Sequence, residues 1–128
     1  MKIVLPLPPK ELHPNARPHW AQKAKATKKY RSDAKWATLY AMDISETNGE
    51  WPTATVKATF YVKTNHKRDA DNMLASLKAA MDGLADAGLI VNDSGLTHLP
   101  VEIVTGSKDP RVELEVVDST NRVPVVGK

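Results

Sequence analysis

The spacing of apolar residues along the chain predicts two helices. From His19 to about Ile44, small and apolar residues recur at three- and four-residue steps, which is typical of a long helix with one narrow buried face. A second helix is expected from the segment Asp69–Asn72 to about Ala87, where Gly88 suits the C-terminal cap. The first stripe consists of Trp20, Ala24, Thr27, Arg31, Ala34, Ala37, Ala41 and Ile44, and the second of Met73, Leu74, Leu77, Ala80, Met81 and Leu84.

A different spacing predicts strands. Residues 55–63 alternate between apolar and polar, and the apolar face consists of Val56, Ala58, Phe60 and Val62. Lys2–Leu7 is expected to form a shorter strand that stops at Pro8, because proline lacks the N–H that a strand ladder needs. Further short strands or turns are expected at 89–92, 100–105 and 111–117, the last two as a hairpin across residues 106–110.

The order of these elements is strand, helix, strand, helix and then short strands. Such a chain suits an α+β domain in which two main helices pack on one face of a small mixed sheet. The length of 128 residues is common for one domain. We therefore expect one domain over residues 1–118 and a flexible C-terminal tail over 119–128, where no pattern is present.

Composition then narrows the classes of function. The chain has no cysteine, which excludes disulfides, cysteine-ligated metals and a cysteine nucleophile, and which is compatible with a reducing cytoplasm. Prolines interrupt the apolar run Ile3–Leu5 at once, which argues against a signal peptide, and no stretch approaches the length of a membrane span. We expect a cytoplasmic protein without a membrane partner.

Basic residues are concentrated near the N-terminus. Residues 1–36 carry nine Lys or Arg and two acids, a net charge of +7, whereas residues 37–128 have a net charge of −4. Such a run is often a solvated helix face, and the alternative is a surface that binds a polyanion. The placement of the carboxylates has to decide between these two interpretations.

Three aspartates need an explanation beyond solubility. Asp69 and Asp71 are two residues apart, which in extended backbone places both side chains on one face, and Asp93 is the third. Neighbouring carboxylates repel one another unless they share a proton or a cation. Mg²⁺ suits this role because it binds a few carboxylates and leaves positions for phosphate oxygens. Lys67 and Arg68 would then hold the flanking phosphates.

These residues also have structural interpretations. Asp71 suits the cap of the second helix, and on one continuous helix Lys78 lies on a line with Asp71 and Asp82, which an ordinary surface ion pair explains equally well. An EF-hand counted from Asp69 is excluded, because Leu74 stands where a glycine is needed. The histidines show no ligand spacing and are expected at the surface: His13, His19, His66 and His98. The tryptophans are expected in the core, with stacking on bases as the alternative: Trp20, Trp36 and Trp51.

Three segments carry a resemblance to a known family, namely Lys67–Asn72, Leu77–Leu84 and Ala87–Asp93, together with the opening Leu7–Pro9 and the following Asn15 and Arg17. Over roughly residues 3–118 the sequence resembles the RusA family of Holliday-junction resolvases. The resemblance implies a small dimeric endonuclease of phage or bacterial origin that nicks four-way DNA junctions symmetrically with Mg²⁺ or Mn²⁺. It also implies that the acidic metal-binding triad falls on Asp69, Asp71 and Asp93.

The catalytic lysine of the family falls less simply on this sequence. The best-known pattern has a lysine four residues after the second aspartate of the box, which here is Ala75. This chain has Lys78 instead, in the matching Lys-Ala-Ala-x-Asp context. On one helix the two positions share a face one turn apart, so we expect Lys78 to take the role.

The hypothesis from the sequence is therefore metal-assisted hydrolysis of DNA, with Asp69, Asp71, Asp93 and Lys78 as the catalytic residues. A twofold dimer would make the paired cuts that a symmetric junction needs. Two alternatives stay open: a non-catalytic protein that binds junctions or duplex DNA, and another metal-dependent phosphoesterase. The residues expected to contact DNA phosphates are Arg17, His19, Lys23, Lys25, Lys28, Lys63, Lys67 and Arg68.

Overall fold

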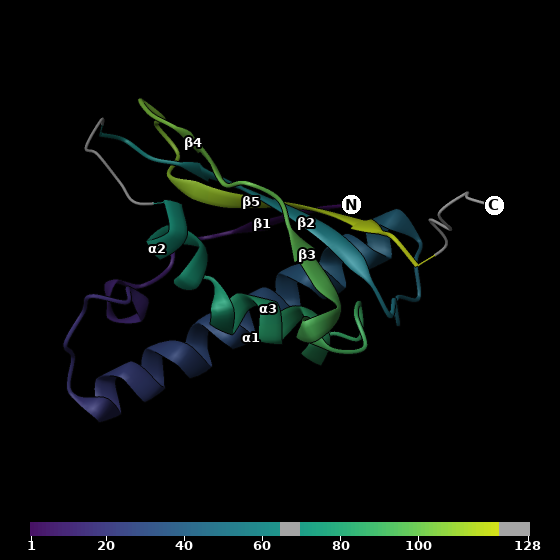
Figure 1. Cartoon of the computed structure of the whole chain (residues 1–128), viewed down its shortest axis with the longest axis horizontal. Helices are drawn as coiled ribbons and strands as arrows, with labels where there is room; N and C mark the ends of the chain where they lie inside the picture. The colour runs from purple at the N-terminus through teal and green to yellow at the C-terminus, as the bar shows by residue number, and fades with distance from the viewer. Residues whose placement is uncertain (65–69, 121–128) are drawn as a thin grey trace.

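A mixed sheet of five strands lies against two helices in the structure, a computed structural model that describes residues 1–64 and 70–120. Helices α1 and α3 lie together on one side of the sheet (Figure 1). The α+β class and the mixed sheet are therefore confirmed. The elements are β1 (Lys2–Leu5), η1 (Lys10–Leu12), α1 (Trp20–Ser45), β2 (Ala54–Tyr61), α2 (Ala70–Ala75), α3 (Lys78–Asp86), η2 (Asp93–Gly95), β3 (Leu96–His98), β4 (Glu102–Val104) and β5 (Arg111–Asp118).

The central strand of the sheet is β2, the strand with the clearest alternation in the sequence. β5 pairs antiparallel along all of β2, and β1 pairs antiparallel with the far edge of β5. β3 and β4 share the other edge of β2 and both run parallel to it. The apolar residues of β2 predicted to share a face are all buried, so this face of the sheet forms the core under the helices.

The predicted hairpin between residues 100–105 and 111–117 is wrong. Both segments contain strands, but β4 and β5 lie on opposite sides of β2. Their connection passes the end of β2, where the Val62 N–H donates to the Val104 carbonyl (2.8 Å) and the Ser107 N–H donates to the Val62 carbonyl (2.9 Å). Alternation and turn residues locate strands but not their partners, and a loop of this length easily spans the distance of about 10 Å across one intervening strand.

The long helix α1 is confirmed, but its buried face differs from the predicted stripe. Its buried residues are Tyr30, Ala34, Thr38, Ala41 and Met42, and none lies within residues 20–29. The N-terminal part of α1 extends away from the sheet, which leaves Trp20 and Ala24 exposed (Figure 1). Neither α1 nor any other described helix is long and apolar enough to cross a membrane.

The second predicted helix is two helices in the structure. α2 ends at Ala75 and α3 begins at Lys78, because the chain tightens at Ser76 and Leu77. The Leu77 N–H donates to the carbonyl of Leu74, three residues back (3.0 Å), and the buried Ser76 hydroxyl donates to the Met73 carbonyl (2.6 Å). Both helices keep the apolar spacing of one helix, so the sequence pattern alone did not reveal the break. Gly88, with φ of +85°, follows α3 as expected of a C-terminal cap.

α3 packs closely against α1 at Gly83. A Cβ at this position would lie 2.5 Å from the Arg31 carbonyl oxygen and 2.7 Å from the Ala34 Cβ, so only glycine fits there. Beside this crossing, the Arg31 guanidinium binds both carboxylate oxygens of Asp86, at 2.5 and 2.8 Å. This ion pair lowers the pKa of Asp86. The crossing and the ion pair together fix α3, and with it the start of α3 at Lys78, against α1.

We expect Gly83→Ala to lower the free energy of unfolding by about 1–3 kcal/mol, because the added methyl overpacks a backbone contact. The measurement is urea denaturation of the two proteins. In a helix with room for a methyl group, the same substitution would raise stability by about 1 kcal/mol, so the sign of the change tests the close crossing. A stabilised Gly83→Ala protein would contradict it.

Candidate functional site

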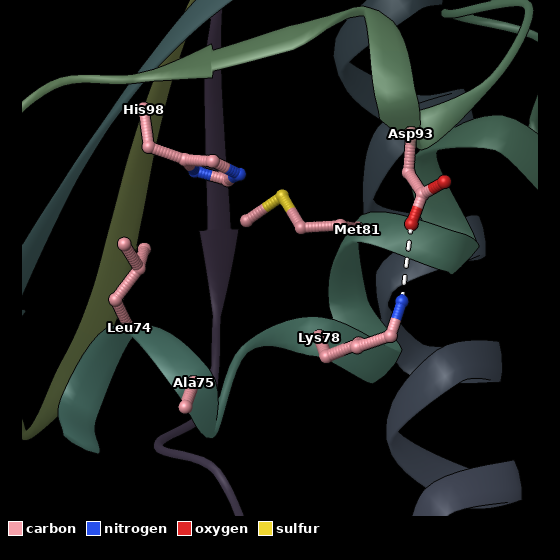
Figure 2. A pocket seen from close by; sticks show the side chains of 6 residues that line it. All are labelled: Leu74, Ala75, Lys78, Met81, Asp93 and His98. Carbon is pink, nitrogen blue, oxygen red and sulfur yellow. Dashed lines mark hydrogen bonds and ion pairs between the residues drawn. The ribbon is translucent and has the colours of Figure 1, made fainter. Parts of the chain in front are cut away.

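The site is built around an ion pair between the start of α3 and the turn η2. Lys78 is the first residue of α3, and Asp93 is the first residue of η2, where the Asn92 side chain accepts from the Ser94 N–H (2.9 Å) and fixes the turn. The Lys78 ammonium lies 3.2 Å from a carboxylate oxygen of Asp93. Figure 2 shows the two side chains pointing toward one another. The structure thus brings together two of the four residues predicted to be catalytic.

Lys78 stabilises the charged form of Asp93. The pKa of Asp93 is lowered, first by the hydrogen bond from Lys78 and then by its positive charge. Asp82, one turn farther along α3, also lies within hydrogen-bonding reach of the Asp93 carboxylate. Two carboxylates so close repel unless a cation or proton lies with them, and here the Lys78 ammonium supplies that charge. The sequence placed Asp82 on the line of Lys78 but did not connect it with Asp93.

A pocket of about 270 Å³ opens beside the ion pair. α2 contributes Leu74 and Ala75 to its wall, so the helix that carries Asp71 borders the same space as Asp93. Ala75, the position of the family lysine, and Lys78, its proposed replacement, both line this pocket. The break between α2 and α3 therefore leaves the lysine at the pocket despite the longer spacing.

Asp71 is exposed and is the second residue of α2. It therefore lies within the first turn rather than at the cap position, where a carboxylate still suits the helix dipole. Asp69, Lys67 and Arg68 lie outside the described residues, so the predicted triad stays a prediction. Within residues 1–64 and 70–120, no three His, Asp or Glu side chains are grouped so that they could hold a metal ion.

His98 is a pocket residue that the sequence did not indicate. It ends β3, a strand that was not predicted, and its ring extends into the pocket beside Met81, across from the Lys78–Asp93 pair (Figure 2). It lies five residues after Asp93, and η2 leads directly into β3, so local sequence already brings it near Asp93. The parallel pairing of β3 with β2 then fixes the strand that carries it.

A second hollow, of about 390 Å³, adjoins the first because Ala75 and Lys78 line both. Its far wall is formed by Lys23 and Thr27 of α1. We call this second hollow, which lies between Lys78 and Lys23 and is also lined by Asp82, the basic groove. It joins the acidic site to the N-terminal part of α1, where positive charge is concentrated and no acidic residue occurs within residues 20–29.

The other predicted DNA contacts occupy several places. Arg17 is exposed in the loop before α1, and His19 caps α1 by accepting from the Ala21 N–H (3.2 Å), a structural role that its sequence position did not reveal. Lys25 and Lys28 are exposed on α1, and Lys63 is exposed just after β2. Of the tryptophans, only Trp51 packs against the core. Trp20 and Trp36 are 75% and 63% exposed, so their prediction as core residues is wrong.

Comparison with known proteins agrees with this architecture. A protein from Xylella fastidiosa (strain Temecula1 / ATCC 700964), described as uncharacterized, is 37% identical over 107 residues, which cover 78% of this chain and 65% of that protein. A model of the family described as endodeoxyribonuclease RusA matches residues 8–117. Fold and site define a small α+β domain with a lysine–carboxylate pocket beside a basic helix. The chain belongs to the RusA endodeoxyribonuclease family, as its sequence motifs indicated.

We expect Lys78→Gln to raise the pKa of Asp93 toward its ordinary value, because the main cause of the lowered pKa is removed. Carbon-detected NMR titration of the Asp93 carboxyl group measures this shift. Lys57→Gln serves as the control, since Lys57 pairs with Glu102 instead, at 3.4 Å. An unchanged Asp93 titration in Lys78→Gln would show that the ion pair does not form in solution.

Proposed function

We propose that this protein is a Mg²⁺-dependent endodeoxyribonuclease that resolves four-way DNA junctions by paired nicking. The observation that carries the proposal is the Lys78–Asp93 pair, held in a pocket that borders α2 and continues into the basic groove. Membership in the RusA family supports the class of reaction. The substrate, the cofactor and the oligomeric state belong to the proposal.

The residues around the pocket fit a hard divalent cation. Carboxylate oxygens are the ligands that Mg²⁺ and Mn²⁺ favour, and Asp93 lies beside a second carboxylate, whose repulsion a bound cation would offset once Lys78 moves to a phosphate. Asp71 and Asp93, together with Asp69, would hold the ion. When bound, it would supply an activated water molecule and stabilise negative charge on the leaving oxygen.

The side chains of the chain itself have separate roles in this proposal. The Lys78 ammonium is mostly exposed, so it can leave Asp93 and bind a non-bridging phosphate oxygen in the pocket. In that position it would stabilise the charge that develops on phosphorus during attack. Lys23, across the second hollow, would hold a neighbouring phosphate and thereby orient the strand.

Paired nicking requires two sites, which a twofold dimer would provide. One exposed apolar surface favours such an association. Tyr40 and Ile44 of α1, 70% and 62% exposed, flank a hollow of about 380 Å³ together with Val4 of β1. β1 is an edge strand of the sheet. We propose that this surface, Val4 with Tyr40 and Ile44, pairs with its copy in a second chain.

We expect Asp71→Asn and Asp93→Asn each to reduce cleavage of four-way junction DNA in Mg²⁺ by about 100-fold or more, since each removes a charged oxygen ligand. Binding of the junction should persist, because a negative charge is lost near the phosphates. Gel assays of cleavage and of binding, with and without chelator, measure both quantities. The control is Asp43→Asn, because Asp43 is an exposed aspartate near the C-terminal end of α1, at the other end of the helix from Lys23.

These assays also separate the two alternatives. A non-catalytic junction-binding protein would bind junctions without cutting them, in Mg²⁺ or in chelator. Another metal-dependent phosphoesterase would hydrolyse small nucleotide esters with little dependence on salt. Cleavage at the wild-type rate by Asp71→Asn would contradict the assignment of the metal ligands.

We expect Ile44→Glu to convert the dimer into a monomer, because a charge would be buried at the twofold contact. Sedimentation equilibrium gives the mass, and the junction assay should then show single nicks instead of paired ones. Val91→Glu, which places the same charge at another exposed apolar residue, is the matched control. Equal masses for the wild-type and Ile44→Glu proteins would exclude this surface as the dimer contact.

A further inference from the structure

The most exposed tryptophan of the chain's described part lies in a hollow that adjoins the basic groove. Trp20 is the first residue of α1 and is 75% exposed. It lines a third, open hollow of about 650 Å³ whose other walls are mainly cationic or small: Lys23, Ala24, Thr27, Lys28 and Arg31. A position on a helix that only faces solvent is usually polar. A large exposed indole beside three positive side chains is therefore unusual.

This hollow adjoins the basic groove, which in turn adjoins the pocket of Asp93. Lys23 and Thr27 line both the Trp20 hollow and the second hollow, and Ala75 and Lys78 line both the second hollow and the pocket of Asp93. A chain of phosphates could therefore follow Lys78, Lys23 and Lys28 outward from Asp93. Trp20 would meet the bases of that strand at the end of its path.

The position of Trp20 is fixed by structure, although the indole itself has no partner in the core. His19 caps α1 through its Nδ1 atom, and its ring lies 5.6 Å from the Trp20 ring at a tilt of 32°. No residue from 20 to 29 is buried, so Trp20 contributes nothing to the core. The helix and its cap thus present the Trp20 ring to solvent in a hollow lined by cationic side chains.

We propose that Trp20 stacks on a nucleobase of an unpaired DNA segment that leaves the acidic site along the basic groove. The inference rests on the proposed function, and it adds a residue that would distinguish unpaired or branched DNA from closed duplex. Stacking requires an accessible base face, which continuous duplex does not offer. Lys23 and Lys28 supply charge complementarity to the phosphates, and Trp20 supplies the contact with the base.

The first test is fluorescence with an oligothymidine of about 12 nucleotides, at the scale of single-strand binding sites. It is carried out in chelator, so that it needs no cleavage. Quenching of indole emission should disappear in Trp20→Phe and persist in Trp36→Phe, which removes the other exposed tryptophan of α1. An oligonucleotide of the same length without bases should quench weakly. Unchanged quenching in Trp20→Phe, or an equal response to blunt duplex, would overturn the proposal.

The second test separates stacking from charge. Trp20→Ala should weaken binding of the oligonucleotide by about 5- to 100-fold and leave the salt dependence unchanged, whereas Trp20→Tyr should retain most of the affinity. Lys23→Ala should reduce the slope of log affinity against log salt by about one. Wild-type affinity in Trp20→Ala, or a loss of slope like that of Lys23→Ala, would overturn the proposal. If the wild-type protein binds in this way but never cuts junctions, the proposed nuclease function fails and the role of Trp20 stands.

Discussion

The contact between α1 and α3 at Gly83 determines where the rest of the site lies. Because the two backbones touch there, α3 has only one depth at which it can pack, and the Arg31–Asp86 ion pair fixes its far end. α3 in turn carries Lys78 and Asp82 to the carboxylate of Asp93. The same crossing orients α1, whose exposed end carries Lys23 and Trp20.

The site combines opposite charges at close range. Asp93 and Asp82 place negative charge in two adjoining hollows, while Lys78, which lines both, and Lys23, which lines the second, present positive charge. A phosphodiester is repelled by carboxylates alone, and the lysines supply positive charge that opposes this repulsion. The net charge of the chain, +3, conceals this separation of a basic helix from an acidic body.

Much of the fold could be predicted from the sequence, because β2 and α1 have strong periodicity and Gly88 marks the end of α3. Strand partners could not be predicted, since the residues of β4 would suit either neighbour. The predicted buried face of α1 was wrong because alanines fit several faces of a helix. That Trp20 is exposed depends on where the sheet ends, since α1 extends beyond the sheet at that end. Within the site, local motifs indicated Asp93 and Lys78, whereas His98 was missed because the three residues of β3 are too few to show a strand pattern.

The turn at Ser76 and Leu77 has a consequence for how spacing along this sequence is interpreted. Because α3 starts anew at Lys78, the seven positions from Asp71 to Lys78 are not two turns of one continuous helix. A helical wheel drawn through this turn therefore misplaces Lys78 relative to Asp71. The contact between the Lys78 ammonium and the Asp93 carboxylate depends on where the second helix begins, which residue counting along one helix does not give.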